Sequence, residues 1–289
     1  MPAPFALELC GFREGRPNTS DKNDSLSQEL GHAFFELLGV PAEKVAPKTV
    51  DKAWSAAMVA DLAERIAPTA PHLGVRAERR LEEFEQYAHL NALKALAEDA
   101  SPEVASALTR LERATHSTGS ELASLVAAVN EAMTAADGRR RALVDLLGDE
   151  SPLRLDVAVD RAVPSSPAGV FDVANHLVAG FSLKWSLRTD RLQDPRTQGA
   201  KMATMRRGRM PHFAAVTMEP RPYMLGRLGR GTGDLDCVYH LALPPLIEAV
   251  RAVFTDNRDR IRQRDIFMRM VEQRRLRDYD DLVAYVATL

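Results

Sequence analysis

The residues best suited to chemistry in this chain are a lysine and an aspartate that interrupt two apolar stretches. Lys184 lies in FSLKWSLRTDR (181–191), and Asp156 lies in LRLDVAVDR (153–161). Both stretches alternate apolar and polar residues, which predicts β-strands. A carboxylate holds a hard cation and a lysine orients water and offsets negative charge, so the pair suits phosphodiester hydrolysis. The pattern is common, however, and two solvated charges at the edge of a sheet would show it as well.

A cluster of charged residues follows the lysine after four positions. Arg188, Asp190 and Arg191 are packed into four consecutive residues. Arginine forks match the O6 and N7 acceptors of guanine in the major groove, and a carboxylate accepts a hydrogen bond from N4 of cytosine. The cluster therefore carries the groups that two G·C pairs require. The competing interpretation is a salt-bridge cluster on the protein surface.

The basic residues are distributed unevenly. Residues 184–230 contain eleven lysines and arginines but three acidic residues, although the whole chain has a net charge of -2. A basic segment on an acidic body is typical of a protein that binds a polyanion. The alternatives are a solvated arginine-rich helix and, at the level of function, an α/β protein that does not bind nucleic acid.

Other classes of protein are disfavoured by composition. The two cysteines, Cys10 and Cys237, are far apart and form no CxxC motif, which argues against a disulfide framework or a zinc site. No stretch of eighteen apolar residues is present, so we expect no membrane partner. The first residues, MPAPFALELCGF, include Glu8 and make a poor signal peptide, so we expect a cytoplasmic protein.

The spacing of apolar residues predicts a helical first half and a sheet in the second half. We expect a polar arm at 11–24 and then helices at 24–40, 48–67, 75–98, 101–115 and 118–147. We expect strands at 153–161, 180–188, 212–219 and 235–243, with a helix at 192–207, a helical tail at 243–289, part of 221–234 as loop, and 170–180 ambiguous. The result is one α/β domain over 1–289, mainly helical in 1–150 and with the sheet in 151–289.

Several segments resemble the NgoMIV family of type II restriction endonucleases, which cut sites with a CCGG core. The matching segments are SLKWSLRTDR (182–191), RTQGAKM (196–202), RRGRMPHFAAVTMEPRP (206–222), GTGDLDCVYHLAL (231–243) and the shorter FEQYAHL (84–90). The resemblance implies a restriction-endonuclease-like fold, in which a small mixed central sheet is flanked by helices. It also implies a single endonuclease domain with Mg²⁺ as cofactor.

The resemblance assigns roles to the residues of the predicted catalytic site. Ser182 and Lys184 match the Ser-x-Lys of the family, and Asp156 takes the place of its metal-binding aspartate. Leu155 stands where a proline is usual, and Asp160 is a rival for the role of Asp156.

A second acidic residue is expected from the helical half of the chain. Glu85 resembles the glutamate on a helix that supplements the metal site, and on a helix it would face inward beside Leu81 and Phe84. The alternative is that Glu85 is an ordinary surface acid. The predicted metal ligands are therefore Asp156 and Glu85.

One residue departs from the family pattern. A second active-site glutamate is expected fourteen residues past the lysine, where this chain has Gln198. The loss of one carboxylate weakens a Mg²⁺ site. Three explanations stay open: a weakened natural enzyme, a deliberately inactivated variant, or an enzyme that takes its acid from another residue. The alternative function is a sequence-specific DNA-binding protein that does not cleave.

The resemblance also implies how DNA is read. Arg188, Asp190 and Arg191 match the Arg-x-Asp-Arg reader of CCGG, and the full site would be GCCGGC, cut after the first G. Candidates for the outer base or for phosphates are Arg221, Arg227 and Ser20. The expected partners are double-stranded DNA, further copies of the chain in a homodimer or homotetramer, and a cognate methyltransferase.

Overall fold

The computed structural model describes residues 1–91, 102–115, 120–147, 153–163, 174–188, 192–230 and 233–289. These residues form two compact units, Met1–Tyr87 together with Leu153–Leu289, and Ala88–Pro152. We expected one domain, and each unit is described by itself. Within the described residues, no helix is long and apolar enough to cross a membrane.

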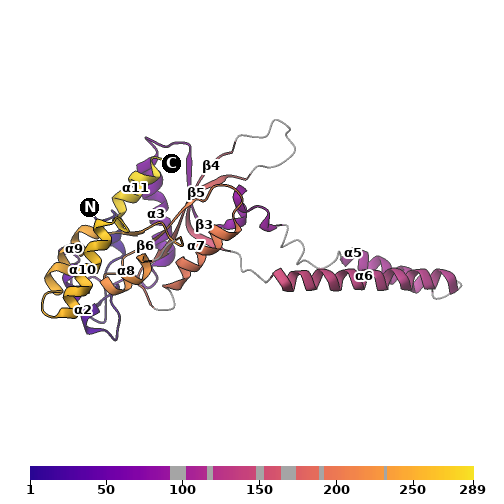
Figure 1. The fold of residues 1–289 in the computed structure, drawn as a ribbon, viewed down its shortest axis with the longest axis horizontal. Coiled ribbons are helices and arrows are strands. Elements are labelled where there is room, and N and C mark those ends of the chain that lie inside the picture. The colour runs from indigo at the N-terminus through magenta and orange to yellow at the C-terminus, as the bar shows by residue number, and fades with distance from the viewer. Residues whose placement is uncertain (92–101, 116–119, 148–152, 164–173, 189–191, 231–232) are drawn as a thin grey trace. The chain divides into compact units, whose positions relative to one another are not determined.

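The first unit is built on a six-stranded mixed sheet in the order β3-β4-β5-β6-β7-β8 (Figure 1). β3, β4 and β5 pair antiparallel, and β5 to β8 pair parallel. The strands are β3 (Leu73–Arg80), β4 (Arg154–Arg161), β5 (His176–Lys184), β6 (His212–Thr217), β7 (Val238–His240) and β8 (Leu276–Asp278). The α/β prediction, with a small mixed sheet and flanking helices, is confirmed, and the architecture is consistent with a restriction-endonuclease-like fold.

Helices cover the sheet because its central strands are apolar on both faces. Val157, Ala158 and Val159 of β4 are all fully buried, as are Ala179 and Phe181 of β5. The helices of this unit are α1 (Ala6–Leu9), α2 (Ser25–Leu37), α3 (Asp51–Ile66), α7 (Gln193–Met205), α8 (Pro222–Gly229), α9 (Leu243–Val253), α10 (Arg258–Glu272) and α11 (Tyr279–Val286). α3 packs on β3 and β4, and α7 packs on β6.

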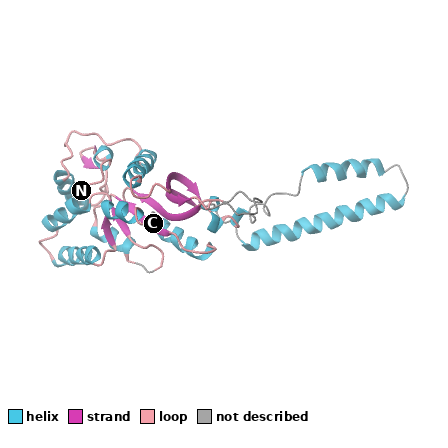
Figure 2. Cartoon of the chain, turned by 90° about the horizontal axis from the view of Figure 1, so that it is seen from above, coloured by secondary structure: helices cyan, strands magenta, loops and turns pink. Residues whose placement is uncertain are grey.

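Shorter elements complete the first unit. A small hairpin of β1 (Phe12–Arg13) and β2 (Arg16–Pro17) lies in the polar arm, and the 3-10 turns η1 (Leu81–Glu83) and η2 (Glu85–Tyr87) follow β3. The second unit contains α5 (Pro102–Thr115) and α6 (Ser120–Leu147), which pack against each other (Figure 2).

The predicted helix at 75–98 is wrong in its first part. Leu73–Arg80 is the strand β3, and the next residues form η1 and η2. The segment RAERRLEE is rich in helix formers, but long-range pairing with β4 overrides that propensity. Its burial alternates residue by residue from Arg76 onward, as a strand requires.

Smaller differences concern the C-terminal half. The segment 221–234 was expected to be loop over part of its length, and its residues Pro222–Gly229 form α8. The tail expected to be helical contains β8. The strand expected at 180–188 ends at Lys184, and its start at His176 resolves the ambiguity of the preceding segment.

Candidate active site

The register of β4 and β5 places Asp156 beside the Ser-x-Lys segment. Val157 pairs with Phe181, so Asp156, one residue earlier, lies next to Ser182 on the adjoining strand. Its carboxylate accepts a hydrogen bond from the backbone N–H of Leu183 at 2.6 Å. Side chains two residues apart share a face of a strand, so Ser182 and Lys184 project to the same side. Two segments that are distant in sequence thus converge as expected.

The electrostatic setting of Asp156 favours a nearby cation. Burial raises the pKa of this carboxyl group above its ordinary value, because it destabilises the charged form. The Leu183 N–H, the Lys184 ammonium and the Ser182 hydroxyl act in the opposite direction but do not cancel the effect of burial. A cation bound at the carboxylate would relieve this cost.

Asp156 and Lys184 line a pocket of about 220 Å³ with further acidic residues. Asp51 of α3, Glu78 of β3 and Asp194 of α7 are the other acids in its lining. Within the described part of the chain, no group of three or more histidine, cysteine, aspartate or glutamate side chains is placed to hold a metal ion unaided. Mg²⁺, however, commonly binds through one or two carboxylates together with waters and substrate phosphates. The oxygen donors of this pocket fit that mode.

Asp194 forms an ion pair with Lys184. Its Oδ2 atom is 3.6 Å from Nζ of Lys184. Gln198, one helical turn further along α7, does not line the pocket, and its Nε2 atom lies 3.5 Å from the carbonyl oxygen of Arg154. The sequence did not single out Asp194, because only the packing of α7 against the sheet brings it to Lys184.

Glu78 is the second acid that the sequence did not reveal. The pairs on either side of it, Ala77 with Val157 and Arg79 with Leu155, place it across from Asp156. Its φ of 49° lies in the left-handed region, which a residue with a side chain rarely adopts. Such strain often accompanies functional sites. The segment had been predicted as a helix, so its position on the sheet was hidden.

Glu85 lies at a different place from the one expected. It is exposed on η2, and its Oε2 atom lies 3.2 Å from Nδ1 of His176, the first residue of β5. Lys184 is the last residue of that strand, roughly 26 Å away at 3.3 Å per residue. The structure therefore does not bring Glu85 to the pocket, and Glu78 is the glutamate found there.

Asp160 is likewise remote from the pocket. It is buried, it accepts a hydrogen bond from Nδ2 of Asn175 at 2.6 Å, and its Oδ2 atom lies 3.3 Å from Nε of Arg76. These contacts satisfy its charge within the sheet. Asp156, not Asp160, shares the pocket with Lys184.

A larger cleft of about 790 Å³ adjoins the pocket. Asp51, Trp185 and Ser186 line both cavities, and Arg188 lines the cleft. Trp185 packs edge-on against Trp54 of α3, with ring centroids 5.4 Å apart, which fixes the chain between the two cavities. Arg188 is exposed. Asp190 and Arg191 lie outside the described residues.

The polar arm contributes much of the lining of this cleft. Ser20, Asp21 and Asn18 contribute to its lining. The Ser20 hydroxyl donates to the backbone carbonyl of Ser27 at 3.0 Å, so the residue also holds the start of α2. The expected arm therefore lines the same cleft as Arg188.

Arg221 is buried and fully engaged. Its guanidinium donates to both oxygens of Glu219 at 2.7 and 3.0 Å, to the carbonyl of Leu187 at 2.6 Å and to Oδ2 of Asp21 at 3.2 Å. Burial disfavours its charge, but the hydrogen bonds of Glu219 hold the pKa of Arg221 above its ordinary value. Arg221 thus ties the residue before Arg188 to the arm. Its guanidinium contacts leave it poorly suited to read a base.

Arg227 lies away from the cleft. It is exposed on α8, and its Nη1 atom donates to the hydroxyl of Tyr223 at 2.9 Å. It lines neither cavity described above. Of the three candidates for the outer base, Ser20 and Arg221 line the cleft, but the guanidinium of Arg221 is already engaged by Glu219.

Comparison with known proteins identifies the family. A family model described as NgoMIV restriction enzyme matches residues 39–288. The type II restriction enzyme NgoMIV of Neisseria gonorrhoeae is 33% identical over 214 residues, which cover 73% of this chain and 64% of the relative. The alignment thus spans slightly less than two thirds of the relative's length. Since the family match extends over most of the chain and includes the pocket residues of β4 and β5, the chain belongs to the NgoMIV family of restriction enzymes.

Proposed function

We propose that the chain is a Mg²⁺-dependent type II endonuclease that hydrolyses double-stranded DNA at a CCGG-core site. The observation that carries this proposal is the convergence of Asp156, Lys184 and Asp194 in a pocket that adjoins the Arg188 cleft. Cleavage chemistry and base recognition then lie on one continuous surface. Rigid coupling of the two is valuable, because an error of about 1 Å in substrate position can cost a hundredfold in rate.

The residues of the pocket have different roles in hydrolysis. Asp156 and Asp194 would supply carboxylate oxygens to Mg²⁺. Glu78 of β3, which lies across from Asp156, is a further carboxylate in the same pocket. When bound, Mg²⁺ supplies Lewis-acid stabilisation of charge on the phosphate and acidifies a water. Lys184 orients the attacking water and offsets charge on a phosphate oxygen. The hydroxyl of Ser182 acts to lower the pKa of the Asp156 carboxyl group.

The bond changes follow from in-line attack of water on phosphorus. The new P–O bond forms as the bond to the 3′ oxygen breaks, which leaves a 5′-phosphate and a 3′-hydroxyl. The attacking water loses a proton to solvent, and the departing 3′ oxygen takes one from solvent. At GCCGGC, cutting after the first G gives a four-base 5′ overhang. Arg188, Asp190 and Arg191 are the residues that we propose read the CCGG core, and Ser20 is the remaining candidate for the outer base.

We propose that Asp194 supplies the carboxylate that Gln198 lacks. The contact between Asp194 and Lys184 supports this assignment, and α7 offers both positions one turn apart. The chain is then an active enzyme that takes its acid from the preceding helical turn. A binding protein without cleavage is the alternative that the experiment below separates.

Further copies of the chain and a second enzyme complete the proposal. A two-fold symmetric site calls for a two-fold symmetric protein, so we propose a homodimer or a homotetramer. An endonuclease of this kind requires a cognate methyltransferase that protects the host's own sites.

The test uses supercoiled plasmids with none, one or two GCCGGC sites. The unaltered protein with Mg²⁺ is expected to linearise the one-site plasmid, to cut the two-site plasmid into two fragments and to leave the plasmid without a site intact. Lys184→Ala is expected to bind a GCCGGC duplex in a gel shift but not to cut it. Binding without cutting by the unaltered protein would establish the alternative function. Neither binding nor cutting would overturn the proposal.

A further inference from the structure

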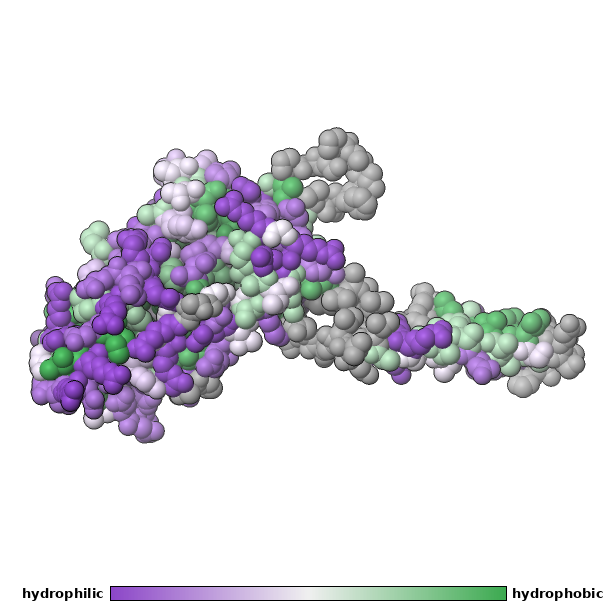
Figure 3. Space-filling model, in the orientation of Figure 1, coloured by the Kyte–Doolittle hydropathy of each residue, from purple (hydrophilic) through white to green (hydrophobic). Residues whose placement is uncertain are grey.

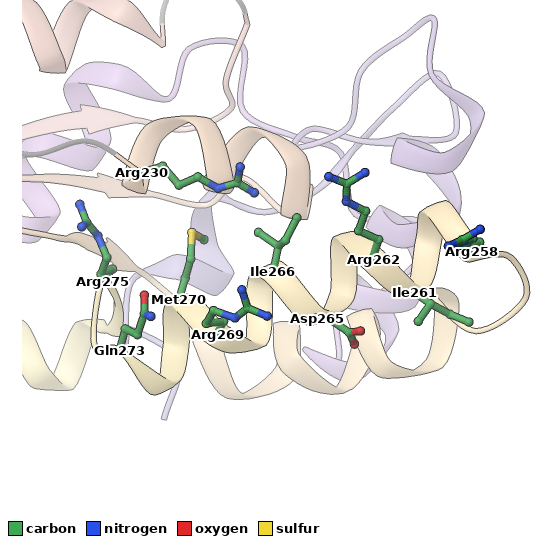
Figure 4. A pocket seen from close by; sticks show the side chains of 10 residues that line it. All are labelled: Arg230, Arg258, Ile261, Arg262, Asp265, Ile266, Arg269, Met270, Gln273 and Arg275. Carbon is green, nitrogen blue, oxygen red and sulfur yellow. The ribbon is translucent and has the colours of Figure 1, made fainter.

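A second hollow on the first unit is not used by the proposed active site. It lies between the C-terminal end of α8 and one face of α10, with a volume of about 870 Å³ (Figure 4). Five arginines line it: Arg230, Arg258, Arg262, Arg269 and Arg275. Asp265 is the acid in this lining, and Ile261, Ile266 and Met270 supply apolar surface beneath the guanidinium groups.

The arginines of α10 form a row along one face of the helix. Arg258, Arg262 and Arg269 are separated by four and seven residues, spacings that return to the same side at 3.6 residues per turn. The eleven-residue span covers roughly 16 Å along the helix axis at 1.5 Å per residue. One DNA strand places a phosphate about every 3.4 Å along the duplex axis, so the row can follow the backbone of about five base pairs.

Asp265 is the acid beside this row, and its ion pair is with Arg264, which is not one of the lining arginines. Arg230, Arg258, Arg262 and Arg269 form no ion pair with any residue that the structure describes, and all four are exposed. Arginines on other sides of α10 differ, since Arg260 pairs with Glu29 and Arg264 contacts Asp265. Like charges gathered around one hollow repel, and a bound polyanion would remove that repulsion.

The alternative is a solvated arginine-rich face. Two features favour a binding surface. The arginines surround a concavity with an apolar floor, whereas solvated side chains spread over a convex helix. The surface over α8 and α10 in the view of Figure 3 is mostly hydrophilic, as is typical of a protein surface that contacts DNA.

The hollow lies beside the recognition cleft. α8 begins after Arg221, which is tied to Leu187 and Asp21 of the cleft wall, and ends before Arg230, roughly 12 Å along the helix. At its other end, α10 is held to α2 through the pair of Arg260 and Glu29, whose oxygen lies 3.0 Å away. The hollow is therefore within reach of DNA that extends a few base pairs beyond the cleft.

We propose that this hollow holds backbone phosphates of the DNA that flanks the recognition site. The inference rests on the proposed function and extends it. Contacts to phosphates carry no sequence information, so they add affinity for longer DNA without changing the site that is read. Arg262 and Arg269, at the centre of the row, are the residues on which the proposal depends most.

The test compares duplexes of two lengths, with one GCCGGC site and with flanks of about three or about twelve base pairs on each side. Binding is measured without divalent metal, so that no DNA is cut. The unaltered protein is expected to bind the longer duplex about tenfold more tightly. Arg262→Gln with Arg269→Gln is expected to lose this gain, to lower the salt-dependence slope by about two and to keep the affinity for the short duplex.

The matched control removes two exposed arginines elsewhere, by Arg161→Gln with Arg251→Gln. It changes the net charge by the same amount and is expected to keep the gain. Arg262→Lys with Arg269→Lys is expected to keep most of it as well. A gain that persists in the double glutamine variant, or that is absent from the unaltered protein, or that is lost equally in the control, overturns the inference.

Two further outcomes are distinguishable. A double glutamine variant that keeps the gain but changes the mass of the protein in solution without DNA would mean that the hollow receives another copy of the chain, which also overturns the inference. Loss of binding to both duplexes by the unaltered protein would refute the proposed function itself, because the short duplex reports on the recognition cleft alone.

Discussion

Lys184 and Asp194 form an ion pair across two elements, with Nζ of the lysine 3.6 Å from Oδ2 of the aspartate. The lysine ends β5 and the aspartate lies in the first turn of α7, so the contact joins the sheet to the helix that carries Gln198. A carboxylate is therefore present beside the lysine even though the position expected to provide it holds an amide. This relationship makes the role of Asp194 testable separately from that of Gln198.

Asp194→Asn is expected to reduce plasmid cleavage by about a hundredfold, because one charged group of the pocket is lost. Gln198→Glu in the same protein is expected to restore part of the activity, since the next helical turn then supplies the acid. Binding of Ca²⁺ or Mg²⁺ is expected to raise the melting temperature of the protein. That rise reports metal binding without any cleavage of DNA. If Asp194→Asn leaves that rise unchanged and only shifts the pH profile of cleavage, the aspartate merely pairs with Lys184 and supplies no metal ligand.

Asp156→Asn is expected to stabilise the protein at neutral pH while abolishing cleavage. Burial raises the pKa of Asp156, so the folded state binds its proton more tightly than the unfolded state does. The stability of the unaltered protein is therefore fully present below the ordinary carboxyl pKa and falls as the pH rises through the raised one. The variant lacks this titration, so its melting temperature should exceed that of the unaltered protein at neutral pH and converge toward it in acid.

Arg188→Ala is expected to cost about 1–3 kcal/mol of discrimination between GCCGGC and a duplex with one altered core base pair. The same loss is expected for Arg191→Ala. Affinities for the two duplexes, measured at one salt concentration, give the discrimination directly. Arg227→Ala serves as the control, because Arg227 is exposed outside the cleft. Equal discrimination by Arg188→Ala and the control would contradict the assignment.

The parts of the fold that local sequence determines were predicted well. The helix expected at 24–40 corresponds to α2, which Asp24 caps by accepting a hydrogen bond from the N–H of Ser27. The strand expected at 153–161 corresponds to β4. β3 was missed because its pairing partner lies some eighty residues further along the chain, and pairing across that separation leaves no local pattern.

The candidate site was predictable where strand alternation exposed a charge and not elsewhere. Asp156 and Lys184 stand out because each interrupts an apolar strand. Glu78 and Asp194 reach the same pocket only through strand register and helix packing. Arg221 was assigned to DNA because it belongs to a basic segment, and a count of charges cannot tell a buried, paired arginine from an exposed one.

Glu219→Gln is expected to reduce the free energy of unfolding by about 3 kcal/mol, because it removes the buried carboxylate that pairs with the guanidinium of Arg221 and leaves only the weaker contact with Asp21. Arg221→Lys keeps a positive charge but loses the planar fork that donates to Glu219, Leu187 and Asp21 at once. Urea unfolding measures the first effect.

The pair of Glu219 and Arg221 is expected to control site selectivity, because both side chains bond the backbone of Leu187, the residue immediately before Arg188. Arg221→Lys should raise cleavage at sites with one altered core base pair relative to GCCGGC. Asp160→Asn is the matched control, since it also disturbs a buried charge. Asp160 lies near the end of β4 away from the pocket, where its partners are Asn175 and Arg76. A merely structural role predicts equal selectivity for two variants of equal stability, whereas a positioning role predicts that only Arg221→Lys loses it.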